Sequence, residues 1–147
     1  MTDVSTVKLE DDLPFLSASA RTIVSNIEHK KQGWTAERVL FAFIRSAQRC
    51  QTRSNAITEP LFARAIERAR SLDAQFAKTG KIVGPLHGVP LSLKDQIDVE
   101  GFDSSIGFTQ DINKPAKEDA TITKILLAAG AVPFVKSVSR SQTRFAA

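Results

Sequence analysis

Apolar positions recur every three or four residues through the first half of the chain, which is the pattern of amphipathic helices. The three predicted helices run from residue 14 to about 31, from 36 to 50 and from 60 to 79. The residues expected to begin or end them are Pro14, Thr35, Pro60 and Gly80. Cys50 falls on the apolar stripe of the second helix, so we expect a buried, unreactive side chain and not a nucleophile.

The pattern changes at a glycine and proline loop that leads into a short apolar strand, within residues 84–95. Because strand side chains alternate, Val89, Leu91 and Leu93 are expected on one face of this strand. Lys94 points the other way and stands at the carboxyl end, where ligands of open α/β sheets gather. A lysine that ends a strand is more often simply solvated, so position alone leaves both interpretations open.

A second strand follows after a long connection. Residues 122–129 are predicted to form a helix capped by Asp119, with Ile122, Ile125, Leu126 and Ala129 on one side, and residues 131–135 a buried strand. A crossover of this kind joins parallel strands by a right-handed connection. We therefore predict an α/β fold in which N-terminal amphipathic helices precede the first strands and the crossover helix of a sheet. Two strands leave that sheet incomplete, and an exposed edge favours self-association or aggregation.

The composition is that of an ordinary globular protein. The 147 residues suit one domain and carry a formal net charge of +4. Basic residues alternate with apolar positions along the helices and form no single patch, so we expect no nucleic-acid partner. No apolar run approaches the roughly 20 residues of a membrane-spanning helix, and neither the single cysteine nor the N-terminus suggests secretion. A cytoplasmic protein with no membrane partner is expected.

No cofactor and no metal are expected. Neither the phosphate-binding loop nor the dinucleotide-binding fingerprint is present in the sequence. His29 and His87 are the two histidines, and no cluster of Cys or His supplies the three or four ligands of a zinc site.

Two runs, GPLHGVPLSLKDQIDVEGFDSSIGF and EDATITKILLAAGAVPFVK, resemble the amidase signature family, especially its fungal acetamidase-type members. The helices from about Gly33 to Gly80 also resemble that family's N-terminal part, so the similarity reaches Lys136. The resemblance implies a mixed sheet, of which this chain holds only the N-terminal portion. The expected parts are an N-terminal helical segment (1–80), the start of the amidase α/β core (81–136) and a divergent polar tail (137–147).

The resemblance implies hydrolysis of small carboxylic amides to a carboxylate and ammonia by a Ser, cis-Ser, Lys triad. Lys94 matches the lysine of that triad. A lysine accepts a proton only when neutral, which requires desolvation or neighbouring cations to lower its pKa. Both serines of the family lie further downstream and have no match here, since Ser104 and Ser105 do not fit their motifs.

The first functional expectation is an N-terminal fragment of an amidase that is inactive alone, because acyl transfer needs the nucleophile as well as its base. The family pattern stops at Lys136, which suggests a truncation, an altered splice or a frame change. The alternative is a noncatalytic fragment that binds or regulates a full-length amidase through an exposed sheet edge.

Overall fold

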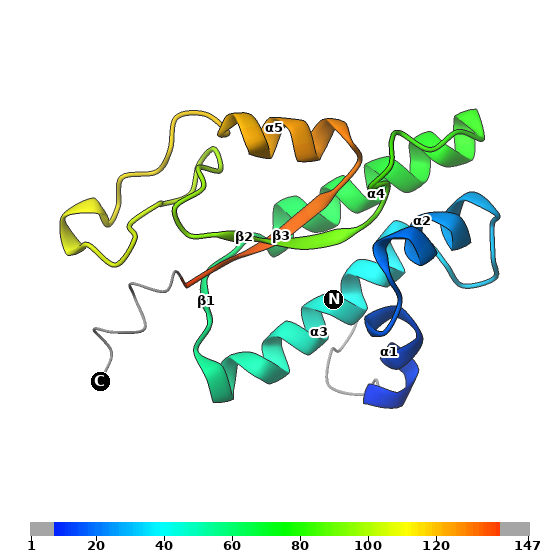
Figure 1. Ribbon diagram of the computed structural model, residues 1–147, viewed down its shortest axis with the longest axis horizontal. Helices are drawn as coiled ribbons and strands as arrows, with labels where there is room; N and C mark the ends of the chain where they lie inside the picture. Colours follow the sequence, from blue (N-terminus) through cyan, green and yellow to red (C-terminus); the bar gives the residue numbers. More distant parts are fainter. Residues whose placement is uncertain (1–7, 139–147) are drawn as a thin grey trace.

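The computed structural model describes residues 8–138 and shows a small mixed sheet with helices on both sides (Figure 1). The strands are β1 (Ile57–Pro60), β2 (Pro90–Lys94) and β3 (Val132–Ser137). The helices are α1 (Leu9–Leu16), α2 (Ala20–Glu28), α3 (Ala36–Ser54), α4 (Phe62–Thr79) and α5 (Thr121–Ala128), with a 3-10 turn, η1 (Thr109–Asp111). The α/β class predicted from the sequence is confirmed.

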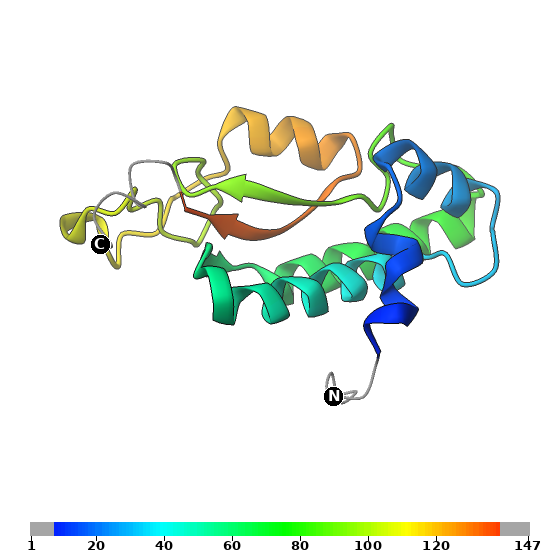
Figure 2. The same ribbon diagram turned by 60° about the horizontal axis from the view of Figure 1, so that its bottom comes forward.

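The central strand of the sheet is β3, because the strand order is β1-β3-β2. It pairs antiparallel with β1 and parallel with β2, so the predicted parallel pair is confirmed. In Figure 2, α3 and α4 lie on one side of the sheet and α5 lies on the other. The core between the helices and the sheet is apolar, with Leu40, Ala69 and Val132 fully buried. Cover on both faces is what a parallel pair of strands requires.

The prediction of one helix from residue 14 to about 31 is wrong, because the structure has two, α1 and α2. At the end of α1, the Ser17 hydroxyl donates to the Leu13 carbonyl over 2.7 Å. Ser19 then caps α2, since its side chain accepts from the Thr22 amide over 3.1 Å. Serine hydroxyls compete for the hydrogen-bonding groups of a helical backbone, so this pair ends one helix and begins the next.

A buried ion pair fastens α1 to α3. Asp12 is fully buried, and its carboxylate accepts hydrogen bonds from Arg45 and, over 2.8 Å, from Arg49. The hydrogen bond from Arg45 lowers the pKa of Asp12, and Arg49 adds to this effect against the opposing influence of burial. The N-terminal helix is therefore held to the rest of the protein by charge.

Two other predicted helix ends are confirmed. The Thr35 hydroxyl accepts from the Arg38 amide over 3.1 Å and so caps α3. Gly80 ends α4 in the left-handed region, at φ +67°. The prediction that Cys50 is buried is wrong, because this side chain is exposed. α3 continues to Ser54, and its apolar spacing extends to Cys50 although this end of the helix faces solvent.

Pro60 does not open a helix. It is the last residue of β1, and α4 begins at Phe62. The sequence reasoning missed β1 because its residues, Ile-Thr-Glu-Pro, show no clear alternation of apolar and polar side chains. The strand owes its place to pairing with β3, in which Glu59 lies opposite Lys136.

The crossover helix exists as α5, but the prediction that Asp119 caps it is wrong. The carboxylate of Asp119 accepts from the Glu100 amide over 2.8 Å and pairs with Arg64 over 2.8 Å. On the predicted apolar side of the helix, Ile122 and Ile125 are 46% and 58% exposed. The apolar spacing of α5 therefore does not identify its buried face.

The predicted alternation of β2 holds only in part. Leu93 is buried and Lys94 is exposed, as expected. The pairing with β3 shifts between Leu91 and Ser92, and Leu91 is only half-buried. Such an irregularity interrupts the strict alternation of a strand.

Candidate active site

Lys94 lies where the sequence predicts, at the carboxyl end of β2. Its side chain is exposed, and its Nζ donates to the Val138 carbonyl over 3.2 Å. In the register of the parallel pair, Lys94 lies opposite Ser137 on β3. The amine is therefore accessible at the edge of the sheet where α/β proteins bind ligands.

A closely packed loop leads into β2 and positions it. Gly88 has a φ of +74°, and a Cβ at this position would lie 2.8 Å from Ile27 Cδ1 and 2.9 Å from Ala36 Cβ. His87 is buried, and its Nδ1 accepts from the Val83 amide over 3.1 Å. Burial lowers the pKa of His87, which favours the neutral ring that this hydrogen bond requires. The loop thus depends on a glycine and on an uncharged histidine.

Asp95 follows Lys94 and ties the end of β2 to several other segments. It is buried, and its carboxylate accepts from the Thr58 hydroxyl on β1 over 2.8 Å and from the Ile106 amide over 2.7 Å. Its own backbone amide donates to the Ser137 carbonyl on β3 over 2.9 Å. The backbone beside Lys94 is therefore held from β1, from β3 and from the loop after β2.

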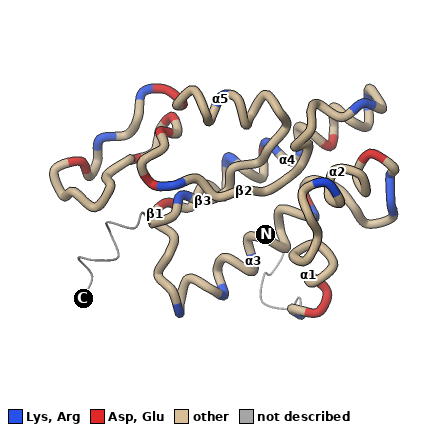
Figure 3. The backbone as a smooth tube through the Cα atoms, viewed as in Figure 1, with Lys and Arg blue, Asp and Glu red and all other residues tan. Residues whose placement is uncertain are grey.

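Sequence reasoning missed Lys136 as a site residue, although the structure buries it completely near the end of β3. Its Nζ donates to the Asp103 carbonyl and, over 2.7 Å, to the Ser104 hydroxyl. Burial lowers the pKa of Lys136, and nearby carboxylates oppose that shift. These carboxylates belong to Asp95, Asp98, Glu59 and Asp103. Figure 3 shows acidic and basic positions close together where the strands meet the loop after β2.

The signal for this burial stood in the sequence. Lys136 directly follows the apolar run Ala-Val-Pro-Phe-Val, and a charged residue that continues a buried strand is itself a candidate for burial. Lysine is almost never fully buried unless it is paired, so a partner for its ammonium was to be expected nearby.

Ser104 and Ser105 lie in the loop after β2. The Ser104 hydroxyl is bonded to Lys136, and the Ser105 hydroxyl accepts from the Gly107 amide over 3.5 Å. Within residues 8–138, neither serine side chain is hydrogen-bonded to Lys94, and Ser104 is bonded to the other lysine, Lys136.

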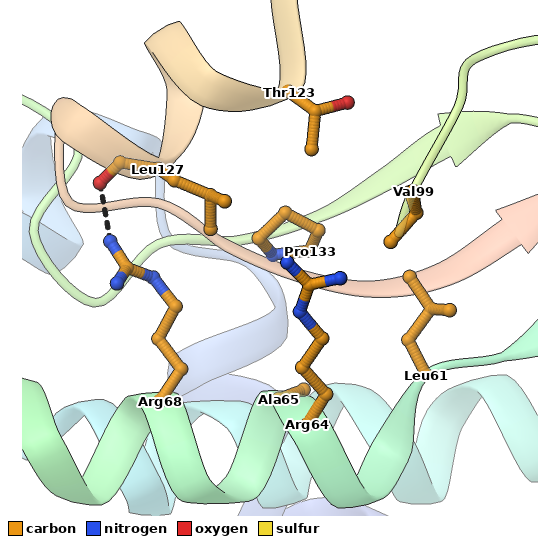
Figure 4. A pocket seen from close by; sticks show the side chains of 8 residues that line it. All are labelled: Leu61, Arg64, Ala65, Arg68, Val99, Thr123, Leu127 and Pro133. Carbon is orange, nitrogen blue, oxygen red and sulfur yellow. Dashed lines mark hydrogen bonds between the residues drawn. The ribbon is translucent and has the colours of Figure 1, made fainter. Parts of the chain in front are cut away.

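The pocket drawn in Figure 4 lies between α4 and α5 and is not lined by Lys94. It encloses about 10 Å³, which is about the space that one water molecule needs. Arg68 reaches across it from α4, donating to the Leu127 carbonyl and, over 2.8 Å, to the Ala131 carbonyl. The pocket is therefore a small packing space between α4 and α5 and is too small for a substrate.

The part of the chain from 8 to 138 contains no group of three or more His, Cys, Asp or Glu side chains placed to hold a metal ion. Over the same residues, no helix is both long and apolar enough to cross a membrane.

Comparison with known proteins agrees with the fold, and the matched residues include Lys94. The family model described as Amidase matches residues 38–143, so the chain belongs to the amidase family. It is 45% identical over 126 residues to a putative amidase, kk1C, of Curvularia clavata, covering 86% of this chain and 23% of that protein. It is 38% identical to an acetamidase of Emericella nidulans, covering 87% of this chain and 23% of that protein.

Among solved structures, the chain resembles a fatty acid amide hydrolase with a TM-score of 0.81 and 27% identity. The match covers 86% of this chain and 22% of that one. The chain thus spans less than a quarter of the length of each of these three relatives. The resemblance inferred from the sequence, to the N-terminal portion of a fungal amidase, is confirmed.

Proposed function

We propose that this chain supplies the lysine-bearing N-terminal part of an amide hydrolase that converts small carboxylic amides to a carboxylate and ammonia. The observation that carries the proposal is Lys94, which ends β2 in the run Gly-Val-Pro-Leu-Ser-Leu-Lys-Asp inside the residues that match the amidase family. The amidases and the acetamidase among its relatives support the reaction class.

In this proposal, Lys94 acts as the base. A neutral Nζ accepts the proton of a serine hydroxyl as the serine oxygen bonds to the amide carbonyl carbon. The proton passes to the leaving nitrogen as the C–N bond breaks, ammonia departs, and water then hydrolyses the acyl ester to the carboxylate. From the family resemblance, we expect both serines beyond the part that this chain matches. Ser104 is no substitute in this scheme, because its hydroxyl is bonded to Lys136. The isolated chain is therefore expected to be inactive.

An assay of the purified chain tests the expected inactivity. Ammonia release from small aliphatic and aromatic amides is compared between the chain and its Lys94→Ala variant. No difference is expected, because a base without a nucleophile does not transfer an acyl group. Turnover by the chain that disappears in Lys94→Ala would show that a complete site is present.

A chimera tests the role of the segment itself. Residues 38–138 replace the matching region of the Emericella nidulans acetamidase, and hydrolysis of acetamide is measured. If this segment holds a functional lysine site, the chimera releases ammonia. A folded chimera without activity would count against the proposal, whereas an insoluble chimera is replaced by one with a shorter graft, residues 84–106.

The second candidate is a noncatalytic fragment that binds a full-length amidase. Its support is the strand order β1-β3-β2, which leaves one edge of β2 without a neighbouring strand within residues 8–138. An unpaired edge is a template for another strand and equally for aggregation. Size-exclusion chromatography with a full-length amidase separates these outcomes, since a defined mixed complex supports binding and separate elution contradicts it.

A further inference from the structure

Lys136 is the fully buried lysine at the carboxyl edge of the sheet, on the face opposite to Lys94. It lies opposite Leu93 in the parallel register and opposite Glu59 in the antiparallel register. Residues that lie opposite one another on paired strands share a face of the sheet. Lys94, one position after Leu93, therefore points away from Lys136. The two lysines cannot act on one atom from the same side.

Both side-chain hydrogen bonds recorded for the Lys136 ammonium reach one segment of the loop after β2. The acceptors are the Asp103 carbonyl and the Ser104 hydroxyl. Burying an ammonium is costly unless it is hydrogen-bonded, so these contacts become much stronger than they would be in water. The cost of burying Lys136 is thus offset by the hydrogen bonds to residues 103 and 104, together with the nearby carboxylates.

The same segment has a second attachment, at its other end. The Ile106 amide donates to the Asp95 carboxylate over 2.7 Å, and Asp95 is the residue next to Lys94. Asp95 is itself fixed by Thr58 of β1 over 2.8 Å. Residues 103–106 are therefore attached to the sheet at both ends, across the carboxyl ends of β2 and β3. Of these two attachments, the one from Lys136 carries the buried cation.

We propose that Lys136 is a positioning residue whose ammonium fastens residues 103–106 to the end of the sheet and so fixes the surroundings of Lys94. The inference rests on the proposed function only for the role of Lys94 as the base. Ser104 serves in it as the hydrogen-bond acceptor of Lys136 and not as a nucleophile. The charge of Lys136, not its bulk, does the positioning, so removing the charge at constant volume releases the segment.

The first readout is hydrogen exchange at the Ile106 amide. Lys136→Met keeps a long side chain and removes the ammonium, and exchange at Ile106 is expected to become at least about tenfold faster, as for the loss of a hydrogen bond to a charged group. Amides in the middle of α3 should keep their protection. Lys124→Met, which removes an exposed lysine paired with Glu118, is the matched control and should leave Ile106 unchanged.

Restoring the charge separates positioning from general stability. Lys136→Cys in a Cys50→Ser background is aminoethylated while unfolded and then refolded, which places an ammonium on a side chain of nearly the original length. The Ile106 amide should regain its slow exchange. Rapid exchange after aminoethylation, in a chain whose α3 amides are protected, would overturn the proposal, because the charge would then not be what holds the segment.

The second readout concerns Lys94 directly. Its rate of acylation by an N-hydroxysuccinimide ester is measured by peptide mass spectrometry, relative to Lys78 in the same sample. The ratio should change by at least about threefold in Lys136→Met, because Asp95, the residue next to Lys94, is bonded to the released segment, and should return after aminoethylation. An unchanged ratio beside fast Ile106 exchange would limit Lys136 to holding the loop and overturn its role in positioning Lys94.

If Lys136→Met does not fold, Ser104→Ala takes its place, since it removes one half-buried acceptor and leaves Lys136 intact. Faster exchange at Ile106 is again expected, and wild-type exchange contradicts the proposal. Neither readout involves amide hydrolysis. An inactive chimera with a slowly exchanging Ile106 amide would therefore overturn the proposed function and leave this inference standing.

Discussion

The buried ion pair of Asp12 gives the sharpest test of how the N-terminal helix is held. In Asp12→Asn the side chain keeps its size but loses the negatively charged carboxylate that accepts hydrogen bonds from Arg45 and Arg49. Breaking a buried pair costs about 3–5 kcal/mol when the remaining charge stays buried. Here the side chains of Arg45 and Arg49 are 16% and 40% exposed and regain some hydration. We therefore expect a loss of about 2–3 kcal/mol in the free energy of unfolding.

Urea unfolding followed by circular dichroism measures this loss. With a slope of about 1–3 kcal/mol per molar urea, the midpoint of Asp12→Asn should fall by about 0.7–3 M. Asp11→Asn is the matched control, because Asp11 precedes Asp12 on the same helix and is exposed. It should shift the midpoint by less than about 0.5 M. Equal midpoints for the two variants would refute the claim that the buried pair fastens α1 to α3.

Three further predictions concern the loop before β2 and the end of α3. Because burial lowers the pKa of His87, the folded state binds fewer protons there than the unfolded state below about pH 6.5, so stability is lost as the pH falls through the folded value. Urea midpoints between pH 7 and pH 5 should fall in the wild type and in His29→Gln, and a slope that persists in His87→Gln would contradict this cause. Gly88→Ala should lower the free energy of unfolding by at least about 2 kcal/mol, since the added Cβ would contact Ile27 and Ala36 at a positive φ. Gly101→Ala is the control for backbone strain alone, because Gly101 also has a positive φ but has open space around the added Cβ. Cys50 should react with a maleimide in native buffer about as fast as in urea, and protection in native buffer would mean that it is buried after all.

The features that sequence reasoning predicted correctly are those set by local chemistry. Thr35 begins α3 and Gly80 ends α4 through contacts within a few residues, and such contacts can be predicted from the sequence. The parallel strand pair followed from apolar runs separated by a long crossover. The location of Lys94 at the carboxyl end of β2 followed from the short apolar run that precedes it in the sequence.

The features that sequence reasoning missed depend on contacts with residues that are distant in the sequence. Cys50 keeps its helical spacing but is exposed. Periodicity alone does not predict where along a helix the packed neighbours end, so the sequence did not reveal this exposure. Asp119 looks like a helix cap, yet Arg64 and the Glu100 amide, both distant in sequence, compete for its carboxylate. Lys136 is buried because a loop more than thirty residues earlier supplies its acceptors. The residues adjacent to Lys136 in the sequence indicate its burial but not which residues pair with it.

The most direct test of the central claim is the rate of ammonia release from acetamide by the chimera that carries residues 38–138, with and without Lys94→Ala. If Lys94 is the base, the substitution should lower kcat by about 10²- to 10⁴-fold, the range that general base catalysis contributes. Lys124→Ala in the same chimera should leave kcat unchanged, because that lysine is exposed on α5 and pairs with Glu118. A Lys94→Ala chimera that folds and releases ammonia at the parental rate would contradict the account.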